Sequence, residues 1–269
     1  MRLPALLLAA ALACSSPTSA GLPGTPGPPE GRAVLFIGNS LTYANDLPAM
    51  FERIAGAAGT PVRVDEATGG NMAVIDHMVA GSRAIARMDE GGWTYVVLQQ
   101  GPTPAGICRD TLVLAAMRAG PHIRNGGGRP VLWLPWARRG FPASLAVAGE
   151  SATLAARAVG GVVAPVGIAW DEALEQDPTL PLYGGDGYHP APAGTLLAAL
   201  TIYDRLFGED VRQIPAGSLA RIPAGGLTEV QAARLAEAAH AASAGIPADP
   251  ATPAPADTTV VSPLGGGPC

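Results

Sequence analysis

The stretch that most constrains the fold is a short apolar run that ends in small polar residues. Val34 to Ile37 are all apolar, and Gly38, Asn39 and Ser40 follow them directly. Such a run is typical of a central strand with helices on both faces, and a glycine after it lets the chain turn sharply. Ser40 is therefore expected at the carboxyl end of a strand, where open parallel sheets bind their ligands. The alternative is that Asn39 and Ser40 simply cap a helix.

Strand and helix patterns alternate along the rest of the chain. The predicted strands are Val34–Ile37, Pro61–Ala67, Trp93–Gln99, Pro130–Trp136 and Gly161–Ala169. The predicted helices are 45–58, Met72–Met88, Arg109–Arg124, Ala143–Val159, Ala191–Phe207 and Thr228–Ala242. Five strands alternating with helices predict an α/β fold, a single doubly wound (flavodoxin-like) five-stranded parallel sheet in a three-layer α/β/α arrangement.

Composition divides the chain into four parts. Residues 1–20 are predicted to be a signal peptide, 21–31 a disordered linker, 32–243 the folded domain and 244–269 a disordered tail. The linker and the tail are rich in proline and glycine and offer little apolar surface to bury. One α/β domain therefore accounts for the folded part of the chain.

The signal peptide has an apolar segment behind Arg2 that is too short to cross a bilayer as a helix. Two cleavage sites compete in it. One is a lipobox-like sequence that ends at Cys14, and the other is the small-residue site that ends at Ala20. We therefore expect an exported protein, either held in the bacterial cell envelope through a lipidated Cys14 or secreted.

Charge and cysteine content exclude several classes of function. The net charge is −5 and every one of the 17 basic residues is an arginine. Lysine Schiff-base chemistry and a P-loop are thus excluded, and no basic patch suits nucleic acid. Of the three cysteines, Cys108 and Cys269 are a candidate disulfide pair, and no Cys/His spacing indicates a metal site. No metal, cofactor or protein partner is predicted.

A second polar motif lies far downstream of Ser40. Asp186-Gly187-Tyr188-His189 stands in a Gly/Pro-rich loop before a long apolar segment. A strand-end serine and an Asp-x-x-His are the parts of a hydrolytic triad: Ser40 as nucleophile, His189 as base, and Asp186 as the acid that orients the imidazole. On its own, the Asp-x-x-His favours a simpler interpretation, in which His189 caps the following helix and Asp186 makes a turn beside Gly187.

Together the two motifs resemble those of the SGNH or GDSL-type hydrolases, with "GNSL" at the nucleophile and "DGYH" at the acid and base. The likeness is strongest to a bacterial branch that begins "FIGNSxTY" and carries Leu-Gln-Gln, and it covers about 33–208. The resemblance implies an oxyanion hole made by the Ser40 N–H, a glycine N–H after the second strand, and an asparagine side chain after the third. Gly70 matches the glycine, with Gly69 as the alternative.

The third oxyanion donor departs from the family pattern, because the chain has Leu98-Gln99-Gln100-Gly101 where the asparagine would stand. A glutamine amide can donate the same hydrogen bond, so Gln100 is the candidate, with Gln99 and Thr103 as alternatives. Trp136 is the candidate substrate-binding residue. His77 is expected to be a hydrogen-bonded, half-buried histidine. Arg138 and Arg139 are either a solvated pair or a site for an anionic substrate.

These motifs predict an exported serine esterase that hydrolyses carboxylic esters through an acyl-enzyme intermediate. The resemblance suggests O-acetyl groups on carbohydrate, so the expected partner is a small-molecule or carbohydrate ester, with no nucleic acid. Two alternatives remain open: a catalytically degenerate SGNH domain that binds envelope glycan, and an O-acyltransferase.

Overall fold

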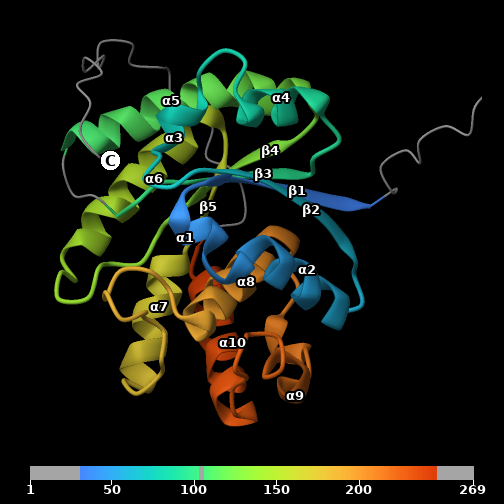
Figure 1. The fold of residues 1–269 in the computed structure, drawn as a ribbon, viewed down its shortest axis with the longest axis vertical. Coiled ribbons are helices and arrows are strands. Elements are labelled where there is room, and N and C mark those ends of the chain that lie inside the picture. Colours follow the sequence, from blue (N-terminus) through green and yellow to red (C-terminus); the bar gives the residue numbers. More distant parts are fainter. Residues whose placement is uncertain (1–30, 103–105, 247–269) are drawn as a thin grey trace, which may run out of the picture.

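The computed structural model describes residues 31–102 and 106–246, which form one sheet between two layers of helices (Figure 1). The predicted signal peptide, Cys14, nearly all of the linker, Thr103 and most of the tail lie outside these residues. Among the described helices, none combines the length and the apolar character that crossing a membrane requires.

The sheet has five parallel strands in the order β2-β1-β3-β4-β5. Their bounds are β1 Arg32–Gly38, β2 Val62–Thr68, β3 Tyr95–Gln99, β4 Arg129–Trp133 and β5 Val162–Ala164. This is the flavodoxin-like strand order, and it confirms the predicted doubly wound α/β/α fold. The carboxyl ends of β1, β2 and β3 lie side by side, since Gly38 pairs with Thr68 and Ile37 with Leu98.

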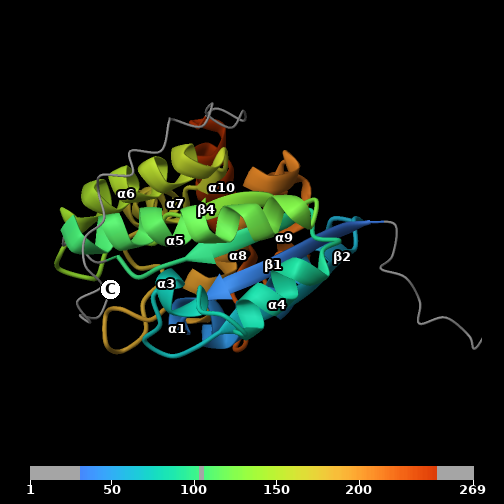
Figure 2. The same cartoon turned by 90° about the horizontal axis from the view of Figure 1, so that it is seen from above.

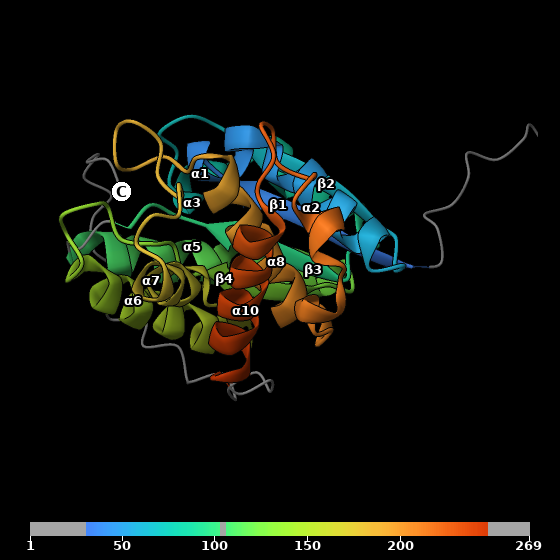
Figure 3. The same ribbon diagram turned by 90° about the horizontal axis from the view of Figure 1, so that it is seen from below.

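Helices cover both faces of the sheet. The helices, with η marking the 3₁₀ helices, are α1 Ser40–Tyr43, η1 Ala44–Asp46, α2 Leu47–Ala57, α3 Val74–His77, α4 Arg83–Glu90, α5 Gly106–Asn125, α6 Ser144–Val159, α7 Val166–Gln176, α8 Pro192–Phe207, η2 Val211–Gln213, α9 Ala216–Leu219 and α10 Glu229–Ala244. Helices α3 to α6 lie on one face, with α4 and α5 in front of the sheet in Figure 2. Helices α2, α7, α8 and α10 lie on the other, with α10 in front in Figure 3.

Alternation along β1 divides the core into two halves. Val34 and Phe36 pack toward α2 and α8, while Leu35 and Ile37 pack toward α3 to α6. All four side chains are fully buried, as expected for a strand with apolar partners on both faces. This burial fixes the register of β1 and therefore the position at which Ser40 leaves the sheet.

Three predicted elements have different bounds in the structure. The predicted helix Met72–Met88 is two helices, α3 and α4, because the chain turns at Gly81, whose φ is +78°. The predicted strand Gly161–Ala169 ends at Ala164, and α7 begins two residues later. An apolar run alone does not distinguish a buried strand from a buried helix. The fourth strand ends at Trp133, three residues before Trp136.

Candidate active site

Ser40, His189 and Asp186 form one hydrogen-bonded chain at the carboxyl ends of the strands. Ser40 is the first residue of α1, directly after β1, and the other two lie in the loop between α7 and α8. His189 Nε2 is 2.8 Å from Ser40 Oγ, and His189 Nδ1 is 2.6 Å from Asp186 Oδ2. Two motifs separated by 149 residues therefore meet in the arrangement of a catalytic triad.

Proton positions follow from these contacts. Ionised Asp186 can only accept, so His189 donates from Nδ1 and keeps the Nε2 lone pair to accept the Ser40 hydroxyl proton. The hydrogen bond from His189, and those from the Tyr188 and His189 N–H groups, hold the pKa of Asp186 well below its usual range. The acid therefore stays charged throughout the neutral pH range.

The turn that carries Ser40 is held by Gln99, the last residue of β3. Gln99 Oε1 accepts from the Asn39 N–H at 2.9 Å and from the Thr42 hydroxyl at 2.8 Å. Gln99 and Thr42 are completely buried. A Cβ on Gly38 would lie only 2.6 Å from Gln99 Oε1, so glycine is required for this close approach.

Asn39 and His77 complete the support of the same turn. Asn39 Oδ1 caps α1 by accepting from the Leu41 N–H, and its Nδ2 donates to the Met72 carbonyl. His77 Nε2 lies 2.9 Å from the Gly38 carbonyl oxygen, and burial lowers the pKa of His77. A neutral His77 therefore donates to that oxygen, in agreement with its expected hydrogen-bonded role, although it is more fully buried than expected.

The loop that carries His189 is held mainly by its own backbone. Asp186 Oδ1 accepts from the N–H groups of Tyr188 and His189, both at 2.9 Å, and the Gly184 N–H donates to the His189 carbonyl at 2.7 Å. Gly187 has φ +66°, a conformation that glycine adopts without strain. The acid thus orients both the imidazole and the backbone that carries it.

Asn45 joins the two parts of the site. Its Nδ2 donates to the carbonyl of Pro190, the residue after His189, and to Thr195 Oγ1 in α8, both at 2.9 Å. Asn45 has φ +54°, a left-handed conformation that asparagine tolerates better than most residues. Sequence reasoning placed Asn45 only at a helix start. An asparagine shortly after the serine motif is the one signal that could have indicated this role.

Comparisons with known proteins agree with the fold. No family model and no curated protein sequence matches the chain. Among solved structures, a DUF4886 family protein from Bacteroides uniformis has a TM-score of 0.66 at 18% identity, covering 79% of this chain and 95% of its own. A candidate SGNH hydrolase from Slackia heliotrinireducens has a TM-score of 0.54 at 25% identity, covering 65% and 98%. TesA has a TM-score of 0.51 at 17% identity, covering 66% and 99%.

The chain has an SGNH-type fold. The resemblance inferred from the sequence motifs is therefore confirmed at the level of the fold. The roles of individual residues depend on the geometry of this site.

Two of the backbone N–H groups predicted for the oxyanion hole have no hydrogen-bonding partner among the described residues. Among the described residues, neither the Ser40 N–H nor the Gly70 N–H donates a hydrogen bond, whereas the Gly69 N–H donates to the Gly38 carbonyl. Of the two glycines considered, Gly70 is therefore the available donor. The Tyr43 hydroxyl lies 3.3 Å from the position that a Cβ on Gly70 would occupy, so this tyrosine borders the same point.

The Gln100 amide is engaged elsewhere and is not free to serve as the predicted third donor. Its Nε2 donates to the Cys108 carbonyl at 3.0 Å and its Oε1 accepts weakly from the Val74 N–H, so the amide is tied to α5 and α3. The side chain is also buried, at 4% exposure. Because successive strand residues point to opposite faces, Gln99 and not Gln100 turns toward the serine. Cys108 itself is disulfide-bonded.

Trp136 also departs from its predicted role. The side chain has no exposed surface and stacks on Trp170 with ring centroids 4.1 Å apart. Its indole N–H donates to the Tyr188 carbonyl at 3.0 Å. Trp136 therefore lies beneath the histidine loop and supports it from the core, instead of lining a substrate pocket.

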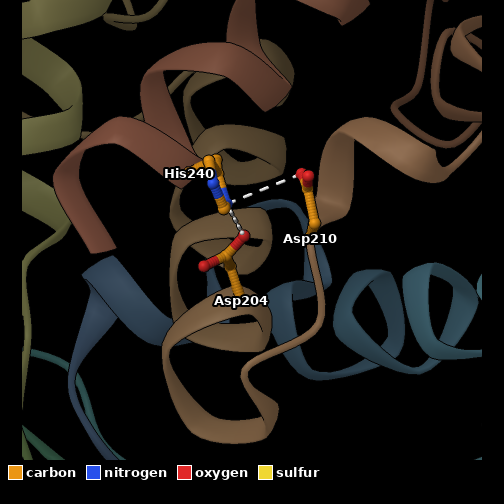
Figure 4. A group of neighbouring side chains, drawn as sticks. All are labelled: Asp204, Asp210 and His240. Carbon is orange, nitrogen blue, oxygen red and sulfur yellow. Dashed lines mark hydrogen bonds and ion pairs between the residues drawn. The ribbon is translucent and has the colours of Figure 1, made fainter. Parts of the chain in front are cut away.

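One cluster among the described residues has the spacing of metal ligands, and it lies away from the SGNH site. Asp204, Asp210 and His240 approach one another near the end of α8 remote from His189 (Figure 4). His240 Nδ1 is 2.9 Å from Asp204 and 3.5 Å from Asp210, and Arg212 binds both oxygens of Asp210. These groups already satisfy one another, so the cluster fastens α10 to α8 and η2.

Proposed function

We propose that the protein is a serine hydrolase that cleaves carboxylic esters through an acyl-enzyme intermediate. The observation that carries the proposal is the chain of hydrogen bonds from Ser40 through His189 to Asp186, at 2.8 and 2.6 Å. The SGNH-type fold supports a hydrolase, and so does the 25% identity to a candidate SGNH hydrolase.

In the first half-reaction, Ser40 Oγ bonds to the ester carbonyl carbon while its proton passes to His189 Nε2. The carbonyl oxygen becomes an oxyanion, and the free N–H groups of Ser40 and Gly70 stabilise it. The tetrahedral intermediate then breaks its bond to the alcohol oxygen, which takes the proton from His189. Asp186 stabilises the imidazolium throughout and does not take its proton.

In the second half-reaction, water gives a proton to His189 and its oxygen bonds to the acyl carbon. Collapse of this second intermediate releases the carboxylic acid and returns the proton to Ser40. The side chains of His189 and Asp186 are 42% and 50% exposed, so water reaches the base directly. This exposure favours hydrolysis over acyl transfer to a second alcohol, and product analysis with an added sugar acceptor distinguishes the two.

Export is a separate part of the proposal. It rests on the composition of residues 1–20, with attachment to the envelope through a lipidated Cys14 or secretion after cleavage. Metabolic labelling with a palmitate analogue tests the lipid: a labelled protein supports the lipoprotein, and an unlabelled one exported to the medium supports secretion.

Substitution of the two reacting groups tests the proposed activity. With a short-chain nitrophenyl ester, Ser40→Ala and His189→Ala should each lower kcat at least about a thousandfold. Ser218→Ala, which alters a serine in α9, is the matched control and should keep full activity. Wild-type rates in either site variant would contradict the proposal.

The degenerate-domain alternative depends on the oxyanion hole. Gln100 is tied to Cys108, so the main candidate for the third donor is engaged elsewhere within the described residues, and a missing donor costs about 3 kcal/mol of transition-state stabilisation. A loss of this size slows catalysis without abolishing it. Covalent labelling of Ser40 by a fluorophosphonate probe would support an active enzyme. The absence of labelling in a folded protein would support a glycan-binding domain.

A further inference from the structure

A groove of about 840 Å³ adjoins the acid and base of the proposed site. It lies between the segment after β4, residues 138–144, and the loop that carries Asp186 and Tyr188. The Tyr188 ring in its wall is also in edge contact with the His189 imidazole, with centroids 5.1 Å apart. The groove therefore opens directly beside the group that moves the proton.

The wall of this groove is mainly apolar. Its larger apolar side chains are Pro102, Phe141, Pro142, Val147 and Tyr188. Phe141 is 63% exposed and Val147 is 36% exposed, so these side chains offer apolar surface to a ligand instead of packing in the core. The volume lies within the range of pockets that hold drug-sized ligands, and it is far larger than an acetyl group requires.

Few polar groups in the groove are available to a sugar. The Ser144 hydroxyl donates to the Phe141 carbonyl. Both oxygens of Asp186 already accept hydrogen bonds from its own loop. Because hydroxyl groups that lose water need new partners, a bare carbohydrate would be poorly matched to this wall.

Arg138 is the charged exception. It lines the groove, and among the described residues its side chain has no carboxylate or other hydrogen-bonding partner. Its neighbour Arg139 lies over the Tyr183 ring, 4.8 Å from the centroid. A guanidinium at the border of an apolar wall binds carboxylate or phosphate oxygens in a bidentate manner. The nearby negative charge of Asp186 is partly offset by its three N–H donors.

We propose that the substrate is an amphipathic ester whose apolar arm lies in this groove and whose anionic group binds Arg138. The inference rests on the proposed ester hydrolysis and names the substrate class for the same site. Arg138 and Phe141 are then the residues that determine specificity. Small acetyl esters of neutral sugars would be poor substrates.

Two matched pairs of esters test whether the site prefers an anionic group. One pair varies the acyl side of the ester and the other varies the alcohol side. The acyl pair is 4-nitrophenyl pentanoate and mono-(4-nitrophenyl) glutarate, which differ in a terminal carboxylate. The alcohol pair is butyl acetate and 4-acetoxybutanoate, followed by titration of released acid. Wild type should prefer the anionic member of one pair, and that pair identifies the arm in the groove. Added salt should reduce the preference.

Arg138→Gln should lower kcat/KM about five- to tenfold more for the preferred anionic ester than for its neutral partner, as expected for a lost charged hydrogen bond. Arg118→Gln removes an exposed charge from α5 and is the matched control. Phe141→Ser removes part of the apolar wall, so it should lower kcat/KM more for a longer apolar chain than for a shorter one on the arm that the pairs identify.

The outcomes separate the inference from the proposed function. If wild type hydrolyses esters but prefers neither anionic ester, or if Arg138→Gln keeps the preference, the inference is wrong and the esterase stands. If the acyl pair shows the preference, faster hydrolysis of 4-nitrophenyl acetate than of longer acyl chains would also overturn it. If no ester is hydrolysed in a Ser40-dependent way, the proposed function itself fails.

Discussion

The turn that carries Ser40 (the serine turn) and the loop that carries Asp186 and His189 (the histidine loop) meet at the site, but they are held in place by different kinds of contact. The serine turn is buried: Asn39 is 6% exposed, Gln99 has no exposed surface, and their contacts come from residues distant in the sequence. The histidine loop is exposed, and its main hydrogen bonds join residues within a few positions of one another. The sheet core therefore fixes the nucleophile, whereas the base is fixed mainly by a short local motif, with Trp136 supporting it from the core.

This difference predicts how substitutions in each part affect stability and catalysis. Changes under the serine turn should alter stability and catalysis together, because the same buried hydrogen bonds serve both. Changes in the histidine loop should alter catalysis with little effect on stability. Asn45, which joins the two parts, should alter mainly their relative position.

The largest effect is expected for Asp186→Asn in the histidine loop. The new amide would donate to His189 Nδ1 and place the imidazole proton on Nε2, where it cannot accept from Ser40. kcat should fall about a thousandfold or more. Because the asparagine oxygen still accepts from Tyr188 and His189, Tm should change little. A large fall in Tm would contradict the local character of this loop.

Gln99→Met should have the next largest effect. It leaves the Asn39 N–H without an acceptor in a buried position, which costs about 1–3 kcal/mol of unfolding free energy. Displacement of Ser40 should also lower kcat about 10- to 100-fold. Denaturant unfolding and steady-state kinetics measure the two effects.

Gln100→Met is the matched control for this position. It removes the hydrogen bonds to Cys108 and Val74, so it should destabilise the protein to a similar extent with a smaller loss of kcat. A loss of kcat of two to three decades in a stable Gln100→Met variant would restore Gln100 as an oxyanion donor. It would also remove the distinction between the two glutamines.

Asn45→Gly should have a smaller effect, limited to the hydrogen bonds that connect the serine turn to the histidine loop. Glycine keeps the left-handed backbone and deletes the side chain that reaches Pro190 and Thr195. kcat/KM should fall about five- to tenfold, as expected for lost hydrogen bonds that position the base. Asp46→Gly is the control: Asp46 is also left-handed but caps α2 at Ala49. Equal losses of kcat/KM in the two variants would contradict the proposed role of Asn45 in connecting the serine turn to the histidine loop.

The sequence predicted both the fold and the three residues of the hydrogen-bonded chain at the site, because each depends on a strong local pattern. Apolar runs located the five strands, and two ordered motifs located Ser40, Asp186 and His189. Their catalytic roles remain predictions. The least accurate boundaries fell where apolar periodicity is ambiguous, as at α7, or where a turn interrupts a helical pattern, as at Gly81 between α3 and α4.

Side-chain direction was harder to predict than position. Gln99 and Gln100 are adjacent, but the alternation of β3 sends only one of them toward the serine. Trp136 follows a strand end, yet its ring turns into the core and stacks on Trp170. Such directions depend on which tertiary partner is present, and no residue near Gln100 or Trp136 in the sequence specifies that partner.

The smallest effect concerns the pH dependence of the serine turn. Burial lowers the pKa of His77 in the folded protein below the ordinary value of 6.5. As pH falls below 6.5, His77 of the unfolded chain takes up a proton, whereas His77 of the folded protein resists protonation. The contribution of the neutral histidine to the free energy of unfolding is therefore fully present above pH 6.5 and is lost as pH falls toward the folded pKa. His77→Gln does not titrate, and its amide retains a donor for the Gly38 carbonyl. Thermal unfolding from pH 5 to 8 should therefore show wild type losing stability relative to His77→Gln as pH falls. A pH-independent difference between the two proteins would mean that the turn does not depend on a neutral histidine.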